Sequence, residues 1–330
     1  MTSRRSLPLV LLAFVLTLAG CGDGARRSAP PPPAAEASAA AFPVTVTNCG
    51  VTTTYQRPPH RAVTMNQHVT EIMLALGLEK SMAGTAYLDD RISPRYEAAY
   101  NSVKVIAKEY PSYEALLSAE PDFVYGGWAS AFDDKAGRSR EALAKAGINS
   151  FLNLEDCAPG PVTTDLLEEE LRTIGRIFGV SDRAEQRIAE LRGLLDGVKA
   201  KVGGVEPVRA VVYDSGDKTV FTAGGAGIGN DMITRAGGRN LFADLDKAYG
   251  DVSFEQVAER APDVIVIYDY GDRTVADKKK FLLASPALKD VPAIKEQRFA
   301  VLPLSSTVLG VRVPEAVESL ARQLHPDSFT

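Results

Sequence analysis

Histidine, cysteine and tryptophan are scarce in this chain of 330 residues, which contains three, three and one of them. The histidines, His60, His68 and His325, are not spaced as the ligands of a zinc site would be. Acidic residues outnumber basic ones and the formal net charge is −5. The chain therefore lacks the positive surface that nucleic acid requires. The sequence predicts no nucleic-acid partner and no metal held directly by the protein.

Signatures of catalysis are missing as well. We find no nucleophile elbow, phosphate-binding loop or paired-carboxylate motif. The run Gly225–Asn230 resembles a dinucleotide-binding loop, but Asn230 stands where the last glycine should be. A turn before a helix is the better interpretation. The sequence therefore favours a protein that is not an enzyme, and it predicts no cofactor.

Only one long apolar run is present, from Leu7 to Ala19. It follows Arg4 and Arg5 and leads through small residues to Cys21. A positive region before a short apolar core is typical of an export signal, and the core is too short to span a bilayer. The pattern resembles a bacterial lipobox, in which residues 1–20 are removed and Cys21 is lipidated. The alternative is an ordinary cleaved signal with a chance cysteine.

The segment after Cys21 is rich in alanine, proline and serine. Such a composition cannot bury enough apolar surface to fold, so residues 21–41 are expected to be a disordered tether. Removing the signal takes the net charge to −7. We therefore expect a lipid-anchored protein on the outer face of the plasma membrane. In that oxidising setting Cys49 and Cys157 should form a disulfide, with two free buried thiols as the alternative.

The chain carries an internal repeat. Residues 112–125 and 253–266 share a serine, an aromatic residue and a glutamate, followed at the same spacing by Pro-Asp and an apolar run. Each copy predicts a helix that is capped by its serine and has an acid in its first turn, where the helix dipole favours it. A buried strand should follow each helix. The chain therefore contains the same unit twice.

A second pair of segments supports the repeat. The helical patterns of Glu71–Leu76 and Asp231–Ala236 each end at a glycine. They follow strand-like segments at 62–64 and 220–222. Each half therefore predicts strand–helix–strand–helix–strand, which is the pattern of a parallel α/β lobe.

A long helical stretch separates the two halves. Apolar residues keep helical spacing from Leu166 to Phe178, and Ser181 should cap a second helix with an apolar stripe from Ile188 to Val202. The expected fold class is α/β, with two similar lobes joined by a long rigid helix and a ligand cleft between them. The predicted divisions are a signal at 1–20, a tether at 21–41, an N-terminal lobe at 42–180, a connecting helix at 181–204 and a C-terminal lobe at 205–330.

These features together resemble a known family. The lipobox, the two repeated units, the helical bridge and the segment Ala236–Asn240 are similar to the helical-backbone class of importer-binding proteins, over roughly residues 43–326. Members of that class are extracytoplasmic receptors that deliver ferric siderophores, cobalamin or haem to an ABC importer. The resemblance implies a monomeric receptor whose partners are a small iron chelate and the permease subunits.

The resemblance also implies that loops after the strands contact a ligand between the lobes. In this chain those loops offer amide, imidazole, carboxylate and hydroxyl groups together with aromatic rings. Any single tyrosine among them has simple packing as its alternative role. The ligand-binding residues expected on this basis are Asn66, Gln67, His68, Tyr87, Trp128, Tyr213, Asp214, Tyr249, Tyr268, Tyr270, Ser306 and Arg312.

The charges in these loops narrow the choice of ligand. Aspartates such as Asp89, Asp214 and Asp269 outnumber the basic residues there. A triply anionic ferric catecholate needs several arginines, so a neutral or cationic ferric hydroxamate is favoured. Cobalamin, and haem with His68 or a tyrosine as axial ligand, are alternatives within the class. An extracellular metal-binding protein or hydrolase is the alternative from another class.

Glu114 and Glu255 occupy equivalent positions in the two repeated units. The resemblance implies that they dock the two lobes on arginines of the permease. The alternative is that each is only an acid favoured by its helix dipole.

Overall fold

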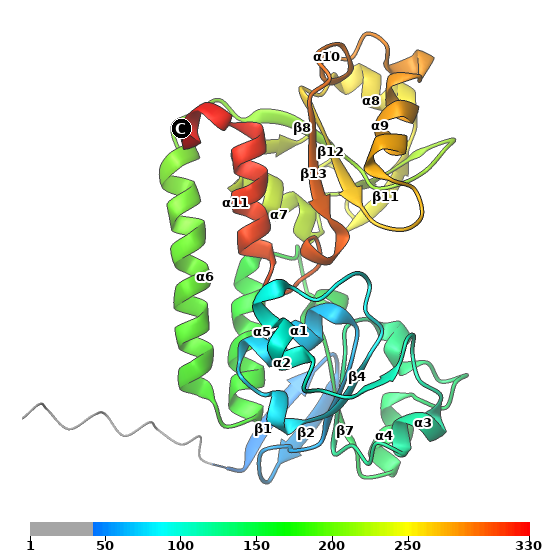
Figure 1. Ribbon diagram of the computed structural model, residues 1–330, viewed down its shortest axis with the longest axis vertical. Coiled ribbons are helices and arrows are strands. Elements are labelled where there is room, and N and C mark those ends of the chain that lie inside the picture. The colour runs from blue at the N-terminus through cyan, green and yellow to red at the C-terminus, as the bar shows by residue number, and fades with distance from the viewer. Residues whose placement is uncertain (1–41) are drawn as a thin grey trace, which may run out of the picture. The chain divides into compact units, whose positions relative to one another are not determined.

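The computed structural model describes residues 42–330, so the predicted signal, the tether and Cys21 lie outside the described residues. All described residues belong to one compact unit of the chain. Figure 1 shows the α/β elements of the two halves and the helices α5, α6 and α11 that accompany them. We keep the predicted division, residues 42–180 and 205–330, to name the first and second lobes.

The first lobe is built on a five-stranded parallel sheet in the order β5-β4-β3-β6-β7. An antiparallel hairpin of β1 and β2 precedes it in the chain. The strands of this lobe are β1 (Val44–Asn48), β2 (Val51–Tyr55), β3 (Ala62–Met65), β4 (Met82–Ala86), β5 (Val105–Ala107), β6 (Phe123–Gly126) and β7 (Asn149–Leu152). Its helices are α1 (Gln67–Ala75), α2 (Glu97–Tyr100), α3 (Tyr113–Leu117) and α4 (Arg140–Lys145).

The second lobe has a four-stranded parallel sheet in the order β10-β8-β12-β13, with β9 and β11 as a separate antiparallel pair. The strands are β8 (Val208–Tyr213), β9 (Val220–Ala223), β10 (Gly238–Asn240), β11 (Tyr249–Val252), β12 (Val264–Asp269) and β13 (Phe299–Pro303). The helices are α7 (Ile228–Arg235), α8 (Phe254–Arg260), α9 (Val275–Leu283), α10 (Pro292–Lys295) and α11 (Val313–Leu324). The two parallel sheets confirm the α/β class.

Each sheet reverses its strand order at one point. In the first lobe the reversal lies between β3 and β6, and in the second between β8 and β12. Ligands of open α/β sheets bind beyond the carboxyl ends of the strands at such a reversal. The topology therefore points to the residues that follow these four strands.

Helices α5 (Thr164–Ile177) and α6 (Ser181–Val202) connect the lobes, and α11 packs against α6 (Figure 1). Ser181 was expected to cap α6, but it is the first helical residue and Val180 occupies the cap position. Apolar side chains from both lobes and from the connecting helices form one continuous core. Its members include Val69, Leu171, Ile188, Met232 and Val317. Burial in a shared core ties the two lobes together.

The repeated units fold alike. Ser112 and Ser253 each accept a hydrogen bond from a backbone amide in the first turn of the helix that follows, at 3.2 and 3.1 Å. The helices are α3 and α8, and each leads to the strand at the reversal point of its sheet.

The predicted pattern was less accurate for residues 220–222. They form β9, as expected, but β9 pairs antiparallel with β11, with one further bridge from Phe221 to Ser215, and does not join the parallel sheet. The strand that takes the central place is β8, which the sequence reasoning did not use. Within residues 42–330, no helix combines the length and the apolar character needed to cross a membrane.

Candidate ligand-binding site

A pocket of about 210 Å³ is lined by residues of both lobes. Two belong to the first lobe, and the others to the second. Four of its residues are aromatic, two are carboxylates and one is a hydroxyl. The lining residues are Asp89, Trp128, Asp214, Phe221, Tyr249, Tyr270, Leu304, Ser305 and Val308.

The sheet topology explains why these residues meet. Trp128 follows β6 and Asp214 follows β8, so each lies beyond a strand at the reversal point of its sheet. Tyr270 follows β12, the partner of β8. The carboxyl ends of these parallel strands therefore deliver an aromatic residue from one lobe and a tyrosine and a carboxylate from the other.

The separate strand pair supplies two more rings. Phe221 on β9 and Tyr249 on β11 stack with centroids 5.5 Å apart and planes at 17°. Antiparallel pairing places Tyr249 diagonally across from Phe221, because Gly250 pairs with Thr222. The second lobe thus contributes a rigid aromatic surface to the pocket.

Both carboxylates of the pocket have unusual surroundings. Burial raises the pKa of Asp214, although its carboxylate accepts a hydrogen bond from the Tyr270 hydroxyl and lies near Lys278. Burial also raises the pKa of Asp89, whose carboxylate accepts a long hydrogen bond of 3.4 Å from the Gln67 amide. No lysine, arginine or histidine is among the lining residues in the described part of the chain. The residues that line the pocket are therefore apolar, aromatic or acidic, apart from Ser305.

Asn66, Gln67 and His68 support the wall of this pocket from behind and do not line it. The His68 ring lies 5.2 Å from Trp128 and is hydrogen-bonded to the Gly127 carbonyl at 3.3 Å. Burial lowers the pKa of His68 to about 4, so the ring is neutral at pH 7. A side chain on Gly127 would approach the His68 ring to 2.4 Å, which is why glycine is required there.

Asn66, which precedes α1, and Gln67, the first residue of α1, form hydrogen bonds with neighbouring segments. Asn66 accepts a hydrogen bond from the Tyr110 hydroxyl at 2.9 Å. Gln67 donates to the Arg91 carbonyl and accepts from the Asp90 amide, at 2.8 and 2.9 Å. These bonds hold the loop that carries Asp89 into the pocket.

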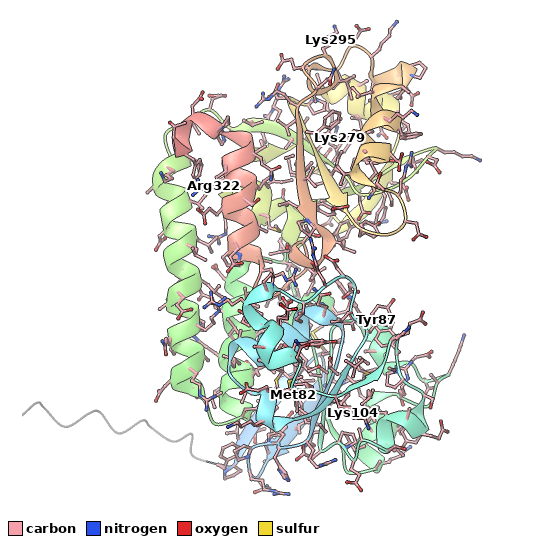
Figure 2. All side chains as sticks on the ribbon, viewed as in Figure 1. Met82, Tyr87, Lys104, Lys279, Lys295 and Arg322 are labelled. Carbon is pink, nitrogen blue, oxygen red and sulfur yellow. A yellow bond between two sulfur atoms is a disulfide. The ribbon has the colours of Figure 1, made fainter. Side chains whose placement is uncertain are left out.

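Several predicted residues lie elsewhere. Tyr87 packs against Tyr110 with ring centroids 4.6 Å apart and planes tilted by 31°, at the upper rim of the first lobe in Figure 2. Tyr213 and Tyr268 are each 1% exposed and belong to the core of the second lobe. Both lie within strands of the central sheet, where side chains pack against helices. The structure does not bring these three to the pocket.

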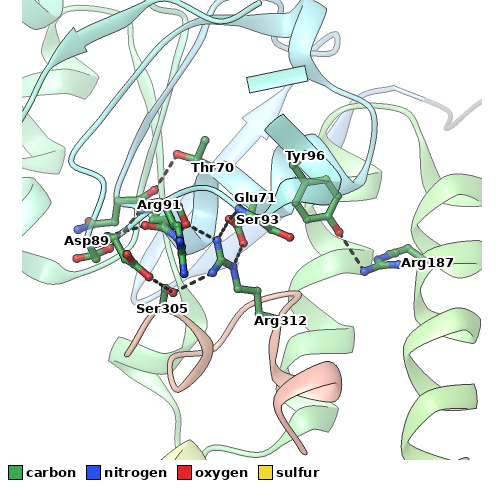
Figure 3. Close-up of polar contacts among 12 residues, drawn as sticks. Thr70, Glu71, Asp89, Arg91, Ser93, Tyr96, Arg187, Ser305 and Arg312 are labelled. Carbon is green, nitrogen blue, oxygen red and sulfur yellow. Dashed lines mark hydrogen bonds and ion pairs between the residues drawn. The ribbon is translucent and has the colours of Figure 1, made fainter. Parts of the chain in front are cut away.

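Two further predicted residues, Ser306 and Arg312, lie next to the pocket but do not line it. Ser305 and Ser306 are both buried, and it is Ser305 that lines the pocket. Arg312 is held by Glu71, Ser305 and the Arg91 carbonyl, beside the pocket (Figure 3). Its guanidinium is used for contact between the lobes and does not line the pocket.

The sequence reasoning missed Phe221, Leu304 and Val308 as lining residues, and noted Asp89 only as a loop acid. Phe221 was not predicted to line the pocket because the sequence did not show that β9 pairs with β11. The Ser305 segment was recognised as a loop after a strand, but its turn decides which serine faces the pocket.

Glu114 and Glu255 are exposed in the first turns of α3 and α8, away from the residues that line the pocket. Each is near its own backbone amide and a capping serine, which lower the pKa of both carboxyls. The two lobes therefore present matching carboxylates.

Cys49 and Cys157 are joined in the structure, with Cα atoms 5.5 Å apart. The bond links the β1–β2 turn to the segment after β7. Nearby, Asn48 exchanges two hydrogen bonds of 2.8 Å with the backbone of Leu152. Among residues 42–330, no group of three or more histidine, cysteine, aspartate or glutamate side chains is placed to hold a metal ion.

Known proteins share this architecture. The profile of a family described as periplasmic binding proteins matches residues 63–305. An uncharacterized ABC transporter substrate-binding lipoprotein of Bacillus subtilis is 26% identical and covers 100% of this chain and 99% of its own. A vitamin B12-binding protein of Vibrio parahaemolyticus is 25% identical over 63% of this chain and 70% of its own.

Solved structures agree. A periplasmic binding protein from Veillonella parvula is 32% identical, with a TM-score of 0.79 over 86% of this chain and 97% of its own. An ABC-type Fe3+-hydroxamate transport protein from Saccharomonospora viridis is 27% identical, with a TM-score of 0.71 over 88% and 99%. These relatives are named for binding and transport and not for catalysis. The chain therefore belongs to the periplasmic binding protein family.

Proposed function

We propose that this protein is the extracytoplasmic substrate-binding component of an ABC importer, and that it captures a neutral or cationic ferric hydroxamate complex. One observation carries the ligand assignment. The pocket combines four aromatic residues with Asp89 and Asp214, and no basic side chain lines it within residues 42–330. Family membership and the similarity to an Fe3+-hydroxamate transport protein support the transport role.

The chemistry of the pocket selects against anions. A triply anionic catecholate complex would meet two carboxylates without an arginine to offset its charge. A trihydroxamate wraps iron in an apolar shell of neutral or positive net charge. Aromatic faces suit such a shell because they give a large contact area at low entropic cost.

Cobalamin is the second candidate. The stacked pair of Phe221 and Tyr249 offers a flat aromatic surface to a planar macrocycle. Relatives that are named vitamin B12-binding proteins favour the same candidate. Haem has less support because His68, the histidine that could ligate its iron, is buried and bonded to Gly127.

Delivery and anchoring complete the proposal. Glu114 and Glu255 dock one lobe each on the permease, and the receptor acts as a monomer. Cys21, which lies outside the described residues, carries the lipid that holds the protein on the outer face of the plasma membrane. A relative named a lipoprotein supports this anchor.

The test is a titration of the purified protein with ferric complexes of different charge, with cobalamin and with haem. Trp128 is the only tryptophan in the chain and lines the pocket, so its fluorescence reports occupancy. We expect saturable quenching by ferric trihydroxamates, confirmed by calorimetry, and none by ferric catecholates. Tight binding of cobalamin or haem with no response to trihydroxamates would overturn the ligand assignment.

A further inference from the structure

A buried lysine lies directly behind the pocket wall. Lys278 on α9 is only 2% exposed, which is rare for a lysine. Its ammonium donates to the carbonyls of Asp214 and Tyr268, at 2.8 and 2.5 Å. These carbonyls lie at the carboxyl ends of β8 and β12. One cation thus joins the ends of the two strands at the reversal point of the second lobe.

The same ammonium touches a lining residue. Its nitrogen lies 4.4 Å from the centre of the Tyr270 ring, within the range of a cation–π contact. An ammonium has three donors, and two carbonyls with one ring face account for all of them. Lys278 is therefore fully used by the wall of the pocket.

Tyr270 and Asp214 complete the unit. The Tyr270 hydroxyl donates to the Asp214 carboxylate, and both residues line the pocket. Asp214 is itself only 5% exposed, so its negative charge needs a nearby compensating charge. The ammonium of Lys278 donates to the Asp214 backbone carbonyl, and its nearby charge acts to lower the pKa of the Asp214 carboxyl.

We propose that Lys278 is a positioning residue for ligand capture, which fixes the Tyr270 ring and keeps the Asp214 carboxylate ionised in the pocket wall. This inference rests on the proposed function, because it assigns Lys278 a role in ligand capture. Its first test, however, requires no ligand. Burial lowers the pKa of Lys278, and the neighbouring Asp214 and Asp269 oppose that shift. The two charges of the unit thus stabilise each other.

Other titratable and charged groups surround Asp214 and Lys278 and would influence the titration of either. They lie at the end of β8 and on the loop after it, on β11, on β12 and its following loop, next to α9, and on the first lobe across the pocket. The titratable and charged groups around Asp214 and Lys278 are Asp89 across the pocket, Tyr213, Asp217, Tyr249, Tyr268, Asp269, Tyr270 and Arg273. Arg273 is the other cation here, and it is engaged by Asp217 at 2.7 Å.

The first test needs no ligand. The carboxyl carbon of Asp214 is followed by NMR against pH in the full chain, and its signal is assigned by its loss in Asp214→Asn. In Lys278→Met the midpoint should move up by about one pH unit, because an opposite charge nearby favours the ionised acid. The control is Lys280→Met, which removes the same charge from the exposed face of α9 and should leave the midpoint in place. Should Lys278→Met not fold, Lys278→Gln keeps two N–H donors without the charge and serves instead.

The second test uses two matched probes, a ferric trihydroxamate with a pendant ammonium and its neutral N-acetylated form. Affinity of the wild type for the cationic probe should fall roughly ten-fold on acidification through the Asp214 midpoint. In Lys278→Met that fall should begin at higher pH, and in Asp214→Asn only the part of it that Asp89 causes should remain. An Asp214 midpoint that is unchanged in Lys278→Met would overturn the inference whatever the ligand. A wild type that binds neither probe would overturn the proposed ligand class and leave the first test standing.

Discussion

Arg312, at the start of α11 in the second lobe, forms an ion pair with Glu71 on α1 of the first lobe (Figure 3). Its Nε donates to a Glu71 carboxylate oxygen at 2.6 Å, and its other nitrogens reach Ser305 and the Arg91 carbonyl. The two side chains are only 14% and 2% exposed. The pair therefore fastens the lobes together beside the pocket.

Breaking this pair should destabilise the protein. Arg312→Met leaves the Glu71 carboxylate buried without its partner, and we expect a loss of about 3 kcal/mol in the free energy of unfolding. The double variant Glu71→Met with Arg312→Met should recover most of that loss, since no unpaired charge remains. Chemical denaturation of the single and double variants measures both. Equal stability of Arg312→Met and the wild type would contradict the account.

The sequence predicted the fold well where local patterns decide it. The serine caps of α3 and α8, the Pro-Asp before β6 and β12, and the glycine after α1 all act within a few residues. The α/β class and the repeat followed from them.

The site was harder to predict because it depends on contacts between distant segments. Glu71 and Arg312 are 241 positions apart, so no local pattern could show that Arg312 is already engaged. Phe221 lines the pocket only because β9 pairs with β11. Tyr213 and Tyr268 are aromatic, as the site was expected to be, but both lie within strands that bury their rings in the core. Trp128, Asp214 and Tyr270 were expected at the site because they follow strands, and Tyr249 because of its position before Ser253 in the family that the chain resembles. All four line the pocket.

Removal of the Cys49–Cys157 bond should lower stability. The bond spans 108 positions, and a crosslink over such a loop contributes several kcal/mol in the chain-entropy model. We expect Cys49→Ser with Cys157→Ser to lose roughly 2 to 5 kcal/mol in the free energy of unfolding. Intact mass before and after reduction and alkylation should show two thiols appearing in the wild type. Two thiols already free in protein taken from the cell envelope would contradict the pairing.

Glu155 should make stability depend on pH. Its carboxylate accepts a hydrogen bond of 2.6 Å from the Leu309 amide of the second lobe, and burial raises its pKa to about 7 from an ordinary 4.5. Between these pH values the folded chain holds a proton that the unfolded chain has lost. The contribution is therefore fully present below pH 4.5 and is lost as the pH rises through about 7.

The variant Glu155→Gln isolates this contribution. Between pH 5 and 8 the wild type should lose roughly 2 kcal/mol of unfolding free energy relative to the variant. Denaturation curves at several pH values measure the difference. Parallel pH profiles of the two proteins would show that Glu155 titrates normally in the folded state.

Glu114 and Glu255 should serve delivery and leave capture unaffected. Glu114→Ala with Glu255→Ala should preserve ligand affinity while uptake by cells collapses, because both carboxylates are exposed and neither lines the pocket. Each charge-assisted contact with the permease is worth about 1 to 3 kcal/mol, so the double variant should be worse than either single one. Glu109→Ala with Glu259→Ala removes two other exposed glutamates from the same lobes and should not affect uptake. A parallel fall of affinity and uptake would place Glu114 and Glu255 in the pocket or the fold.

The charge preference of the pocket tests the central claim most directly. We would measure dissociation constants for a cationic ferric trihydroxamate and a triply anionic ferric catecholate, with the wild type and with Asp89→Asn plus Asp214→Asn. The control carries Asp134→Asn and Asp272→Asn, which remove two exposed carboxylates that do not line the pocket. The account predicts that the wild type and the control prefer the cationic complex and that the pocket variant narrows this preference roughly ten-fold. An equal preference in all three proteins, or a wild type that prefers the catecholate, would contradict it.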